Sequence, residues 1–534
     1  MSTRQKVVVV GSGPIGALSA LYAARRGYDV ELYELRDDPN HGDPTLRPDF
    51  AVIPLSLSER GIRAIEGANV SGLLENILND SRPITVRMIH TTDARGNLKE
   101  ITMEYGPQGQ CLHTIQRETV TKHCLLALEK EPAAKLMFNH KLTNVDFDNK
   151  TVTMESVLWK DTSYNIDQGH ASGKESPVDL QPVGQVASTF RGAADQQPVD
   201  TLRFKTVKYD FLIGADGTYS STRNHLMRKI EMDISQVYAN LLWCDLIFAG
   251  DDDGNYRMDP TCLHLWPANK NIIVAQPDFD GSFRAGMICQ AEQVRYYEAH
   301  PKEFASFFDK EFPGIVGKLV SAEEITAQFV AHQKIPLKSV KLNKFGYKDD
   351  VLLLGDSAHM MTPFHAMGMI IGLEDVRIFF EQFRDPAQAA SQSSAFCPEG
   401  TVAAYTAHRV SDVNTMVDMA NEHYHELRYG VRSRFARARK ACDNLLSRWV
   451  PFLGWIPLYA RIQFTHERFS VIRKKEARQK NMTILLFFAS TTAFACIVAA
   501  ALQNWMRATL VTGGLSGATR VSSQPALLVS PTLD

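Results

Sequence analysis

Residues 5–36 read QKVVVVGSGPIGALSALYAARRGYDVELYELR, and this stretch decides the fold. A β-branched run from Val7 to Val10 leads directly into a glycine pattern from Gly11 to Gly16. An alanine-rich run from Ala17 to Arg26 follows, and then a second apolar run from Val30 to Glu34. The change of periodicity predicts a strand, a tight turn, a helix and a second strand. This order is typical of a Rossmann-like nucleotide-binding unit.

The glycines of this pattern have separate expected roles. Gly11 permits the tight turn, Gly13 lets the backbone approach a pyrophosphate, and Gly16 lets the helix pack closely on the strand. The helix that begins near Pro14-Ile15 presents free N–H groups and the positive end of its dipole to phosphates. Glu34 is placed to accept hydrogen bonds from ribose hydroxyls, although a solvated strand-end carboxylate is the alternative. FAD and NAD share this fingerprint, so it predicts a nucleotide without choosing one.

Two later stretches choose between these cofactors. Residues 209–223 read YDFLIGADGTYSSTR, and residues 351–359 read VLLLGDSAH. Each is an apolar strand that ends in a small residue and an aspartate, Asp216 or Asp356. Because parallel strands end at the same edge of a sheet, both carboxylates are expected to face the cofactor crevice. This set favours FAD, and an NAD-dependent dehydrogenase would leave both motifs unexplained.

The composition excludes several other classes of protein. The chain has 534 residues, of which 44% are hydrophobic and 22% charged, which is ordinary for a folded protein. A net charge of −2 argues against a dedicated nucleic-acid-binding protein. The eight cysteines are scattered without a CxxC pair, which indicates reduced thiols and neither a disulfide framework nor a zinc site.

A C-terminal segment departs from the soluble pattern. Residues 482–502 read MTILLFFASTTAFACIVAAAL and contain no charge, and about 20 apolar residues span a bilayer as a helix. The alternative is a buried core helix. Basic residues are concentrated before this segment, between Arg473 and Lys480, so the positive-inside rule places the large N-terminal part in the cytosol. The stretch from Pro451 to Arg473 is predicted to be an amphipathic helical region that lies against the membrane.

The predicted fold class is α/β, with a Rossmann-like FAD-binding domain and an antiparallel-sheet substrate domain. Four β-rich stretches predict the second sheet: Ile101–Tyr105, Leu241–Phe248, Leu263–Trp266 and Ile272–Ala275. Polar residues 161–200 are interpreted as a surface insertion. The expected boundaries are 1–80, 111–240 and 341–400 for the FAD-binding domain, 81–110 and 241–340 for the substrate domain, 401–480 for a helical region, 481–503 for a transmembrane helix and 504–534 for a tail.

The order of GxGxxG, DG and GD resembles that of the class A flavoprotein aromatic hydroxylases. The resemblance covers about residues 5–500 and is closest to a branch whose eukaryotic members are held in the mitochondrial outer membrane. The stretches that carry this closer match are Leu32–Asp37, Leu57–Gly61, Arg87–His90, Phe138–His140, Asp216–Ser220, Leu263–Pro267 and Ile456–Tyr459. The resemblance implies FAD, NADPH, molecular oxygen and a hydroxylated aromatic product, formed through a C4a-hydroperoxide of the reduced flavin.

The resemblance also assigns site residues. The loop from Gly11 to Gly16 would hold the pyrophosphate, and Glu34 the ribose. The further cofactor-binding residues that it implies are Arg36, Arg117, Asp216, Arg223, Asp356, Gly368 and Met369. Arg87 and Tyr105 match a pair that grips the carboxylate of an aromatic amino acid, which suits a guanidinium fork and a phenol. As alternatives, Arg87 is a surface ion-pair partner and Tyr105 an ordinary strand tyrosine. No catalytic acid or base and no metal are expected, and His359 is interpreted as noncatalytic.

The chain departs from the family pattern PF-x-G-Q-G-M-N-A-G-x-E-D after the GD motif. Residues 363–375 read PFHAMGMIIGLED, so Ala366 replaces a glycine, Met367 a glutamine and Ile370 an asparagine. That asparagine lies near flavin and substrate in the family, which makes Ile370 a substrate-site residue here. Pro54 likewise replaces an asparagine. Two alternatives therefore stay open: a related hydroxylase of another aromatic acid in a specialised pathway, and a flavin-binding membrane protein that no longer hydroxylates.

Overall fold

The computed structural model describes most of the chain. The described residues are 4–42, 55–93, 95–105, 109–157, 203–268, 270–383, 396–425, 442–443, 446–447, 449 and 454–514. Pro54, most of the 384–400 stretch, residues 426–441 and the predicted insertion at 161–200 lie outside them. The chain divides into two compact units, residues 1–473 and 474–534.

A six-stranded sheet forms the centre of the first unit. Its strand order is β18-β19-β12-β1-β2-β8, and every neighbouring pair is parallel except β18 with β19. The strands are β1 (Lys6–Val10), β2 (Asp29–Tyr33), β8 (Ala134–Met137), β12 (Phe211–Gly214), β18 (Gly346–Tyr347) and β19 (Val351–Leu353). Val7 to Val9 are fully buried, as expected for a parallel strand that is covered on both faces. The predicted Rossmann-like unit is confirmed.

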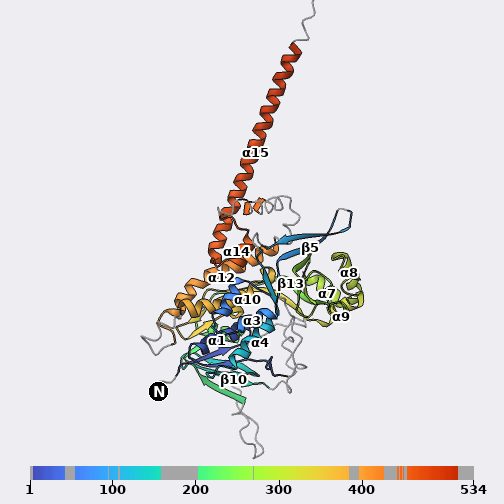
Figure 1. The fold of residues 1–534 in the computed structure, drawn as a ribbon. Helices are drawn as coiled ribbons and strands as arrows, with labels where there is room; N and C mark the ends of the chain where they lie inside the picture. The colour runs from blue at the N-terminus through green and yellow to red at the C-terminus, as the bar shows by residue number, and fades with distance from the viewer. Residues whose placement is uncertain are drawn as a thin grey trace, which may run out of the picture. The chain divides into compact units, whose positions relative to one another are not determined.

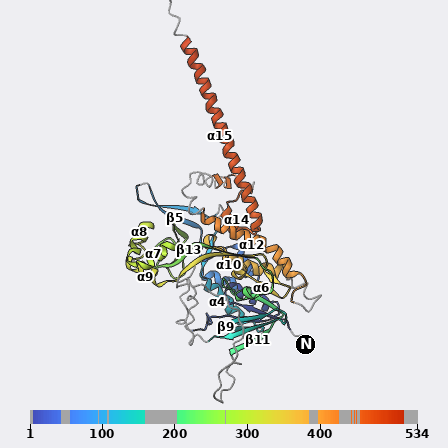
Figure 2. The same ribbon diagram turned by 180° about the vertical axis from the view of Figure 1, so that it is seen from behind.

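Helices cover this sheet. They are α1 (Pro14–Arg25), α2 (Glu59–Glu66), α3 (Leu73–Asn79), α4 (Arg117–Leu128), α6 (Ser221–Lys229) and α10 (Gly368–Ile378). The π-helix η5 (Phe379–Phe383) continues α10, and the 3-10 turns η3 (Gly355–Ser357) and η4 (Pro363–His365) precede it. Two three-stranded sheets flank the unit: β3 (Leu55–Leu57), β7 (Leu112–Ile115) and β4 (Arg82–Ile84), and β11 (Phe204–Lys208), β10 (Thr151–Ser156) and β9 (His140–Asp146). Figures 1 and 2 show β9 to β11 at the opposite end of this unit from α12 and α14.

A second large sheet has seven strands in the order β17-β13-β16-β15-β14-β5-β6. They are β5 (Val86–Thr92), β6 (Leu98–Glu104), β13 (Ile234–Phe248), β14 (Cys262–Pro267), β15 (Ile272–Pro277), β16 (Phe283–Gln290) and β17 (Lys334–Leu342). All pairs are antiparallel except β14 with β5, and all four predicted β-rich stretches take part. The helices α7 (Ala291–Ala299), α8 (Phe304–Glu311) and α9 (Ala322–Ala331), with the turn η2 (Pro301–Glu303), gather beside β13 (Figure 1).

The C-terminal part of the first unit contains α12 (Thr401–His425) and α14 (Leu458–Phe464). The prediction that this stretch lies against the membrane is wrong for α14. Ala460 to Gln463 are each at most 3% exposed, and the Nε of Arg60 donates to the carbonyl of Ile462 at 3.3 Å. Because four consecutive residues of α14 are buried, this helix packs within the protein, against α2 and α10.

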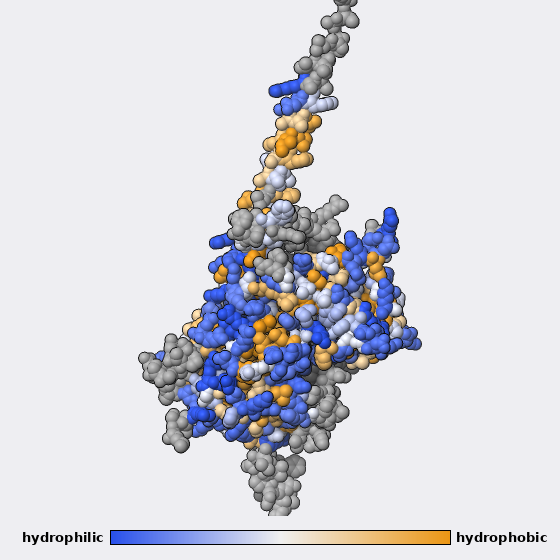
Figure 3. Space-filling view, in the orientation of Figure 1, coloured by the Kyte–Doolittle hydropathy of each residue, from blue (hydrophilic) through white to orange (hydrophobic). Residues whose placement is uncertain are grey.

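Helix α15 (Phe469–Gly514) contains the predicted transmembrane segment. Residues 469–507 include an 18-residue window of mean hydropathy 2.2, and none of that window is buried in the structure. This lack of burial argues against the alternative of a core helix. Figure 3 shows hydrophobic side chains along this part of the helix. Within the described residues, α15 is the one helix that is long and apolar enough to cross a bilayer.

Candidate functional site

The three nucleotide-binding motifs meet at one edge of the central sheet. Gly11 has φ of +97°, and a Cβ placed on it would lie 2.4 Å from the carbonyl oxygen of Ala215, just before Asp216. A Cβ on Gly16 would lie 1.9 Å from the Gly11 carbonyl oxygen. The side chain of Ile15 occupies the space beside Gly355 and Gly372, where an added Cβ would lie 3.0 Å and 2.6 Å away. Glycine is therefore required at Gly11 and Gly16, where backbone atoms leave no room for a methyl group, whereas Gly355 and Gly372 make room for the Ile15 side chain.

Glu34 and two arginines surround the glycine loop. The carboxylate of Glu34 is 7% exposed and accepts the Ser12 N–H at 2.7 Å and the Arg36 N–H at 3.0 Å. These bonds fix the carboxylate at the end of β2, next to the loop. Arg117 begins α4 and brings its guanidinium close to Gly13, since a Cβ on that glycine would lie 3.4 Å from Nη2. The structure thus brings together the residues that were predicted to hold the cofactor phosphates and ribose.

Asp216 and Arg223 have their polar atoms turned into the protein. The carboxylate of Asp216 accepts the Ser220 hydroxyl at 2.5 Å and the Thr222 N–H at 2.9 Å, at the start of α6. Burial raises the pKa of Asp216, and these hydrogen bonds oppose the shift. The guanidinium of Arg223 donates to the carbonyls of Thr218 at 2.7 Å and Ser357 at 3.0 Å. In this geometry the pair joins the DG segment to the GD segment and fixes the loop that carries Asp356.

A second cluster forms where β5 and β6 meet α14. Arg87 lies on β5, and its guanidinium carbon is 3.5 Å from the centre of the Tyr459 ring and 5.1 Å from that of Tyr105. The two tyrosine rings stack with centres 5.7 Å apart. Tyr105 is 5% exposed, and neither its hydroxyl nor the Nε of Arg87 has a hydrogen-bond partner among the described residues. The predicted pair is therefore assembled, with Arg87 and Tyr105 side by side.

Apolar side chains line the remainder of this cluster. Ile84, Leu112 and Leu263 are buried with Tyr105, and Leu265, Val274, Tyr459 and Phe464 pack against them. The Phe464 ring lies 6.4 Å from Tyr105 in an edge-on arrangement. A site of this composition suits an aromatic ligand that carries one anionic group, because the apolar walls exclude water while the guanidinium stays available.

The segment from Pro363 to Ile370 connects the two clusters. Ala366 adopts φ of +54° and ψ of +30°, the left-handed conformation that favours glycine. Gly368 and Met369 begin α10, and Met369 packs in the large core of the central sheet. Met367 and Ile370 are fully buried in a different apolar cluster, with residues of α12 and α14 such as Val413 and Ile462. The structure therefore does not group Ile370 with Arg87 and Tyr105; apolar neighbours surround it.

A buried network of charges holds α10 against α2 and α12. Glu374 pairs with Arg60 at 2.6 Å and with Arg409 at 2.8 Å. Asp375 pairs with Arg409 at 2.7 Å and with the Nε2 of His359 at 2.5 Å. All five side chains are at most 2% exposed. His359 therefore has a structural partner in Asp375.

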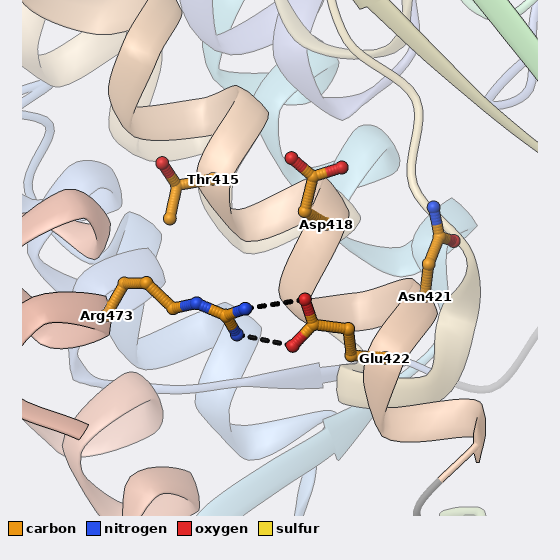
Figure 4. Close-up of a pocket in the computed structure, with 5 residues that line it drawn as sticks. All are labelled: Thr415, Asp418, Asn421, Glu422 and Arg473. Atoms are coloured by element: carbon orange, nitrogen blue, oxygen red, sulfur yellow. Dashed lines mark hydrogen bonds and ion pairs between the residues drawn. The ribbon is translucent and has the colours of Figure 1, made fainter. Parts of the chain in front are cut away.

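Two surface cavities lie away from the glycine loop. One, of about 420 Å³, is lined by Thr415, Asp418, Asn421, Glu422 and Arg473 (Figure 4). The Arg473 guanidinium forms a fork with the Glu422 carboxylate, with Nη2 at 2.6 Å from Oε1. A smaller cavity of about 190 Å³ lies between β5, β6 and the residues after α8, with His90 and Trp266 in its wall. Neither contains a predicted cofactor or substrate residue.

The chain is similar to known proteins over most of its length. It is 34% identical to kynurenine 3-monooxygenase of Aspergillus oryzae over 509 residues, which is 94% of this chain and 92% of the relative. It is 36% identical to kynurenine 3-monooxygenase of Chaetomium globosum, over 94% of this chain and the whole relative. The same enzyme of Neurospora crassa is 36% identical, over 89% of this chain and 88% of the relative. The chain belongs to the kynurenine 3-monooxygenase family.

Two further comparisons agree with this family. A model described as an FAD binding domain matches residues 181–393. A 2-methyl-3-hydroxypyridine-5-carboxylic acid oxygenase has a TM-score of 0.56 and 15% identity, covering 86% of this chain and 96% of its own. A probable FAD-dependent monooxygenase from Pseudomonas aeruginosa has a TM-score of 0.56 and 17% identity, covering 82% of this chain and all of its own. At these identities the two structures establish the fold alone.

The glycine crevice fits the FAD that kynurenine 3-monooxygenases require. Gly11, Gly13 and Gly16 keep side chains out of the loop, and Glu34 stands at the end of β2, where a ribose would lie. The protein is thus an FAD-dependent monooxygenase.

The loop glycines and Glu34 were predicted from the sequence because they belong to a short, informative motif. Gln463 and His365 had no assigned role because neither belongs to a motif with a known chemical role, and Tyr459 was noted only as the end of a stretch that carries the family resemblance.

Proposed function

We propose that this protein hydroxylates L-kynurenine at ring carbon 3, giving 3-hydroxykynurenine, and consumes NADPH and O₂. Two observations support the proposal: the family membership, and the placement of Arg87, Tyr105 and Tyr459 in one apolar cluster beside the FAD domain. The placement of these three residues is the stronger support, because together they would form a binding site for a carboxylated aromatic compound. The reaction belongs to tryptophan catabolism and NAD biosynthesis.

Arg87 would bind the substrate carboxylate. Its guanidinium offers several donors in one plane, and its contacts with the two tyrosine rings hold that plane in position. The Tyr105 hydroxyl, which is buried and lacks a partner among the described residues, would donate to the same carboxylate. The aromatic ring of the substrate would then lie among Leu263, Leu265 and Val274.

FAD supplies the activation of oxygen when it is bound, and the chain positions it. We assign the pyrophosphate to the loop from Gly11 to Gly16, including the N–H groups near Pro14 and Ile15, and the ribose to Glu34. We assign the phosphates and ribitol to Arg36, Arg117 and Asp356. Asp216 and Arg223 fix the crevice through their hydrogen bonds to α6 and to the GD segment. Gly368 and Met369 would present backbone to the flavin at the start of α10.

The remaining work of the protein is orientation and exclusion of water. The apolar side chains around Tyr105 and the packed loop after Pro363 would keep water away from the reacting atoms when FAD and substrate are bound. A general base is not required, since the oxygen-transfer chemistry belongs to the cofactor.

We further propose that α15 anchors the protein in the mitochondrial outer membrane, with residues 1–473 in the cytosol. The apolar window of α15 and the basic residues that precede it support this orientation. The family resemblance supports the organelle.

The proposal is tested with purified protein, FAD, NADPH and L-kynurenine. We expect NADPH oxidation to depend on kynurenine and the product to gain one oxygen atom at carbon 3 by mass spectrometry and by comparison with authentic product. NADH in place of NADPH tests the choice of nicotinamide. Flavin reduction with release of hydrogen peroxide alone, across several aromatic acids, would refute a hydroxylase and favour a flavin-binding protein without hydroxylation.

A second candidate is hydroxylation of a different aromatic acid. The altered segment with Ala366, Met367 and Ile370 favours it, because the corresponding asparagine lies near flavin and substrate in the family. Product formation from another carboxylated aromatic compound, at higher kcat/KM than from kynurenine, would establish this candidate. The retained Arg87 and Tyr105 imply a carboxylate in either substrate.

A further inference from the structure

His365 presents a buried imidazole with two unused ring nitrogens. The residue is 2% exposed, and neither Nδ1 nor Nε2 has a hydrogen-bond partner among the described residues. Buried polar atoms in proteins are almost always paired, so an imidazole left in this state within a ligand site points to a partner on the ligand.

Gln463 carries a second unused acceptor at the same place. Its amide Nε2 donates to the carbonyl of His365 at 2.8 Å and to the hydroxyl of Tyr459 at 3.4 Å. The amide oxygen Oε1 of Gln463 takes no part in these bonds. It is buried and has no hydrogen-bond partner in the described part of the chain. The amide nitrogen is thus committed to fixing the loop, while the amide oxygen is available.

Both acceptors lie next to the proposed carboxylate site. The His365 ring stacks on His423 with centres 4.2 Å apart, and its centre is 5.9 Å from that of Tyr459. The same Tyr459 ring carries the Arg87 guanidinium on its face at 3.5 Å. The donors of Arg87 and the acceptors of His365 and Gln463 therefore gather around one tyrosine.

The surroundings keep His365 neutral. The pKa of His365 lies well below the ordinary value, mainly because the residue is buried and further because His423 and Arg87 are close. The other titratable side chains at this place are Tyr459 of α14 and Tyr105, which follows β6. A neutral imidazole has one nitrogen that accepts a hydrogen bond, whereas the guanidinium of Arg87 has donors only. The site therefore contains a cation, Arg87, that can bind an anionic group. It also contains neutral acceptors, on His365 and Gln463, that can bind a hydrogen-bond donor.

We propose that His365 and Gln463 bind the α-ammonium group of the substrate whose carboxylate is bound by Arg87. This inference rests on the proposed function and specifies its substrate class: an α-amino acid, selected over the same aromatic acid without the amino group. An ammonium group has three donors and no acceptor, so it complements two neutral acceptors and is repelled by Arg87.

The test compares L-kynurenine with its des-amino analogue, 4-(2-aminophenyl)-4-oxobutanoic acid. For each compound, kcat/KM and the Kd from flavin absorbance are measured in the full-length enzyme and in His365→Phe and Gln463→Leu. We expect the unaltered enzyme to prefer kynurenine by tenfold or more and His365→Phe to reduce that preference by about tenfold, as for a lost hydrogen bond to a charged group. His365→Gln keeps an acceptor and should retain most of the preference.

Two controls separate recognition from folding. FAD content and thermal unfolding are measured for every variant, and His300→Phe alters an exposed histidine at the end of α7. If the unaltered enzyme hydroxylates kynurenine but His365→Phe and Gln463→Leu keep the full preference, the inference is refuted and the proposed function stands. If neither compound is hydroxylated, the proposed function fails, and equal Kd values for the two compounds then refute the inference as well.

Discussion

The guanidinium carbon of Arg87 lies 3.5 Å from the centre of the Tyr459 ring. Arg87 belongs to β5 of the seven-stranded sheet, whereas Tyr459 belongs to α14 near the end of the catalytic unit. A cation over an aromatic face is held by the ring quadrupole, and this interaction strengthens when water is excluded. The C-terminal helical region therefore contributes to the proposed substrate site.

The first prediction concerns Arg87. Arg87→Ala should raise the KM for kynurenine by about ten- to a hundredfold, because a charge-assisted hydrogen-bonded contact of roughly 1.5–3 kcal/mol is removed. FAD content should not change, since no described contact joins Arg87 to the glycine loop. Steady-state kinetics and the flavin-to-protein absorbance ratio measure the two effects. Tyr459→Phe is the matched variant: it keeps the ring over Arg87 and should change KM much less. Loss of FAD in Arg87→Ala would show that this arginine is misplaced.

The second prediction separates two glycines of the loop. Gly16→Ala should lower both protein stability and FAD content, because the new methyl group would lie 1.9 Å from the Gly11 carbonyl oxygen. Gly13→Ala should fold normally, since its methyl group would meet only the Arg117 guanidinium at 3.4 Å. It should nevertheless bind FAD more weakly, because the methyl group stands where the backbone approaches the pyrophosphate. Thermal unfolding and FAD titration of the apoprotein distinguish the two. Equal unfolding temperatures for both variants would contradict the proposed packing.

The third prediction concerns backbone strain at Ala366. This residue has φ of +54°, a conformation that costs a residue with a Cβ about 1–2 kcal/mol and glycine very little. Ala366→Gly should therefore raise the free energy of unfolding by up to about 1 kcal/mol, after the greater entropy of glycine in the unfolded chain is subtracted. Ala358→Gly is the control, because Ala358 has φ of −97° and should lose stability. Chemical denaturation measures both, and a destabilised Ala366→Gly would be inconsistent with relief of strain.

The fourth prediction concerns acid stability. Burial raises the pKa of Glu374 and Asp375, but nearby positive groups lower both values by more. Arg409 and Arg60 lower the pKa of Glu374, and His359 and Arg409 lower that of Asp375. The resulting pKa values lie below the ordinary values of 4.5 for Glu374 and 3.8 for Asp375. A carboxylate with a lowered folded pKa stabilises the protein above its unfolded pKa, and this contribution is lost as pH falls through the folded pKa. The free energy of unfolding should therefore decrease as the pH falls below about 4.5.

Arg409→Met tests the source of this effect. It leaves two buried carboxylates without a shared cation, so it should cost about 3–5 kcal/mol at pH 7. It should also weaken or reverse the loss of stability below about pH 4.5, because without this cation the folded pKa of both carboxylates rises toward or above the unfolded pKa. Arg203→Met is the matched control, because Arg203 pairs with Glu155 but is 61% exposed, and such pairs contribute about 1 kcal/mol or less. An unchanged acid profile in Arg409→Met would exclude the network as the origin.

The fifth prediction concerns the membrane helix. Deletion of residues 482–534 should move the protein from the membrane fraction to the soluble fraction and leave FAD content intact, because the apolar window of α15 is removed while residues 1–473 are kept. Fractionation with carbonate extraction measures the release. Replacement of the deleted segment by an unrelated apolar span of equal length is the control and should restore membrane binding. Persistent membrane binding of the shortened protein would instead locate an anchor within residues 1–481.

The sequence by itself determined the nucleotide-binding unit. Close backbone packing at Gly11 and Gly16 excludes side chains, and a β-branched run before a glycine turn has few alternative structures, so a local pattern was sufficient. The apolar character of residues 482–502 was equally local, because each residue contributes to membrane transfer independently of its neighbours in space. Arg87 and Tyr105 were predicted as a pair through family resemblance, and their side chains do lie together.

Only the tertiary structure decided how α14 is used. Its amphipathic pattern is compatible with a membrane surface or with a protein core, and periodicity cannot distinguish the two. Packing against Arg60 and the Pro363–Ile370 segment brings Tyr459 over Arg87 and Gln463 against His365. These contacts join residues that are remote in the chain, and no pattern in the chain records them. The nucleotide fold thus follows from short-range constraints, whereas the composition of the substrate site follows from long-range packing.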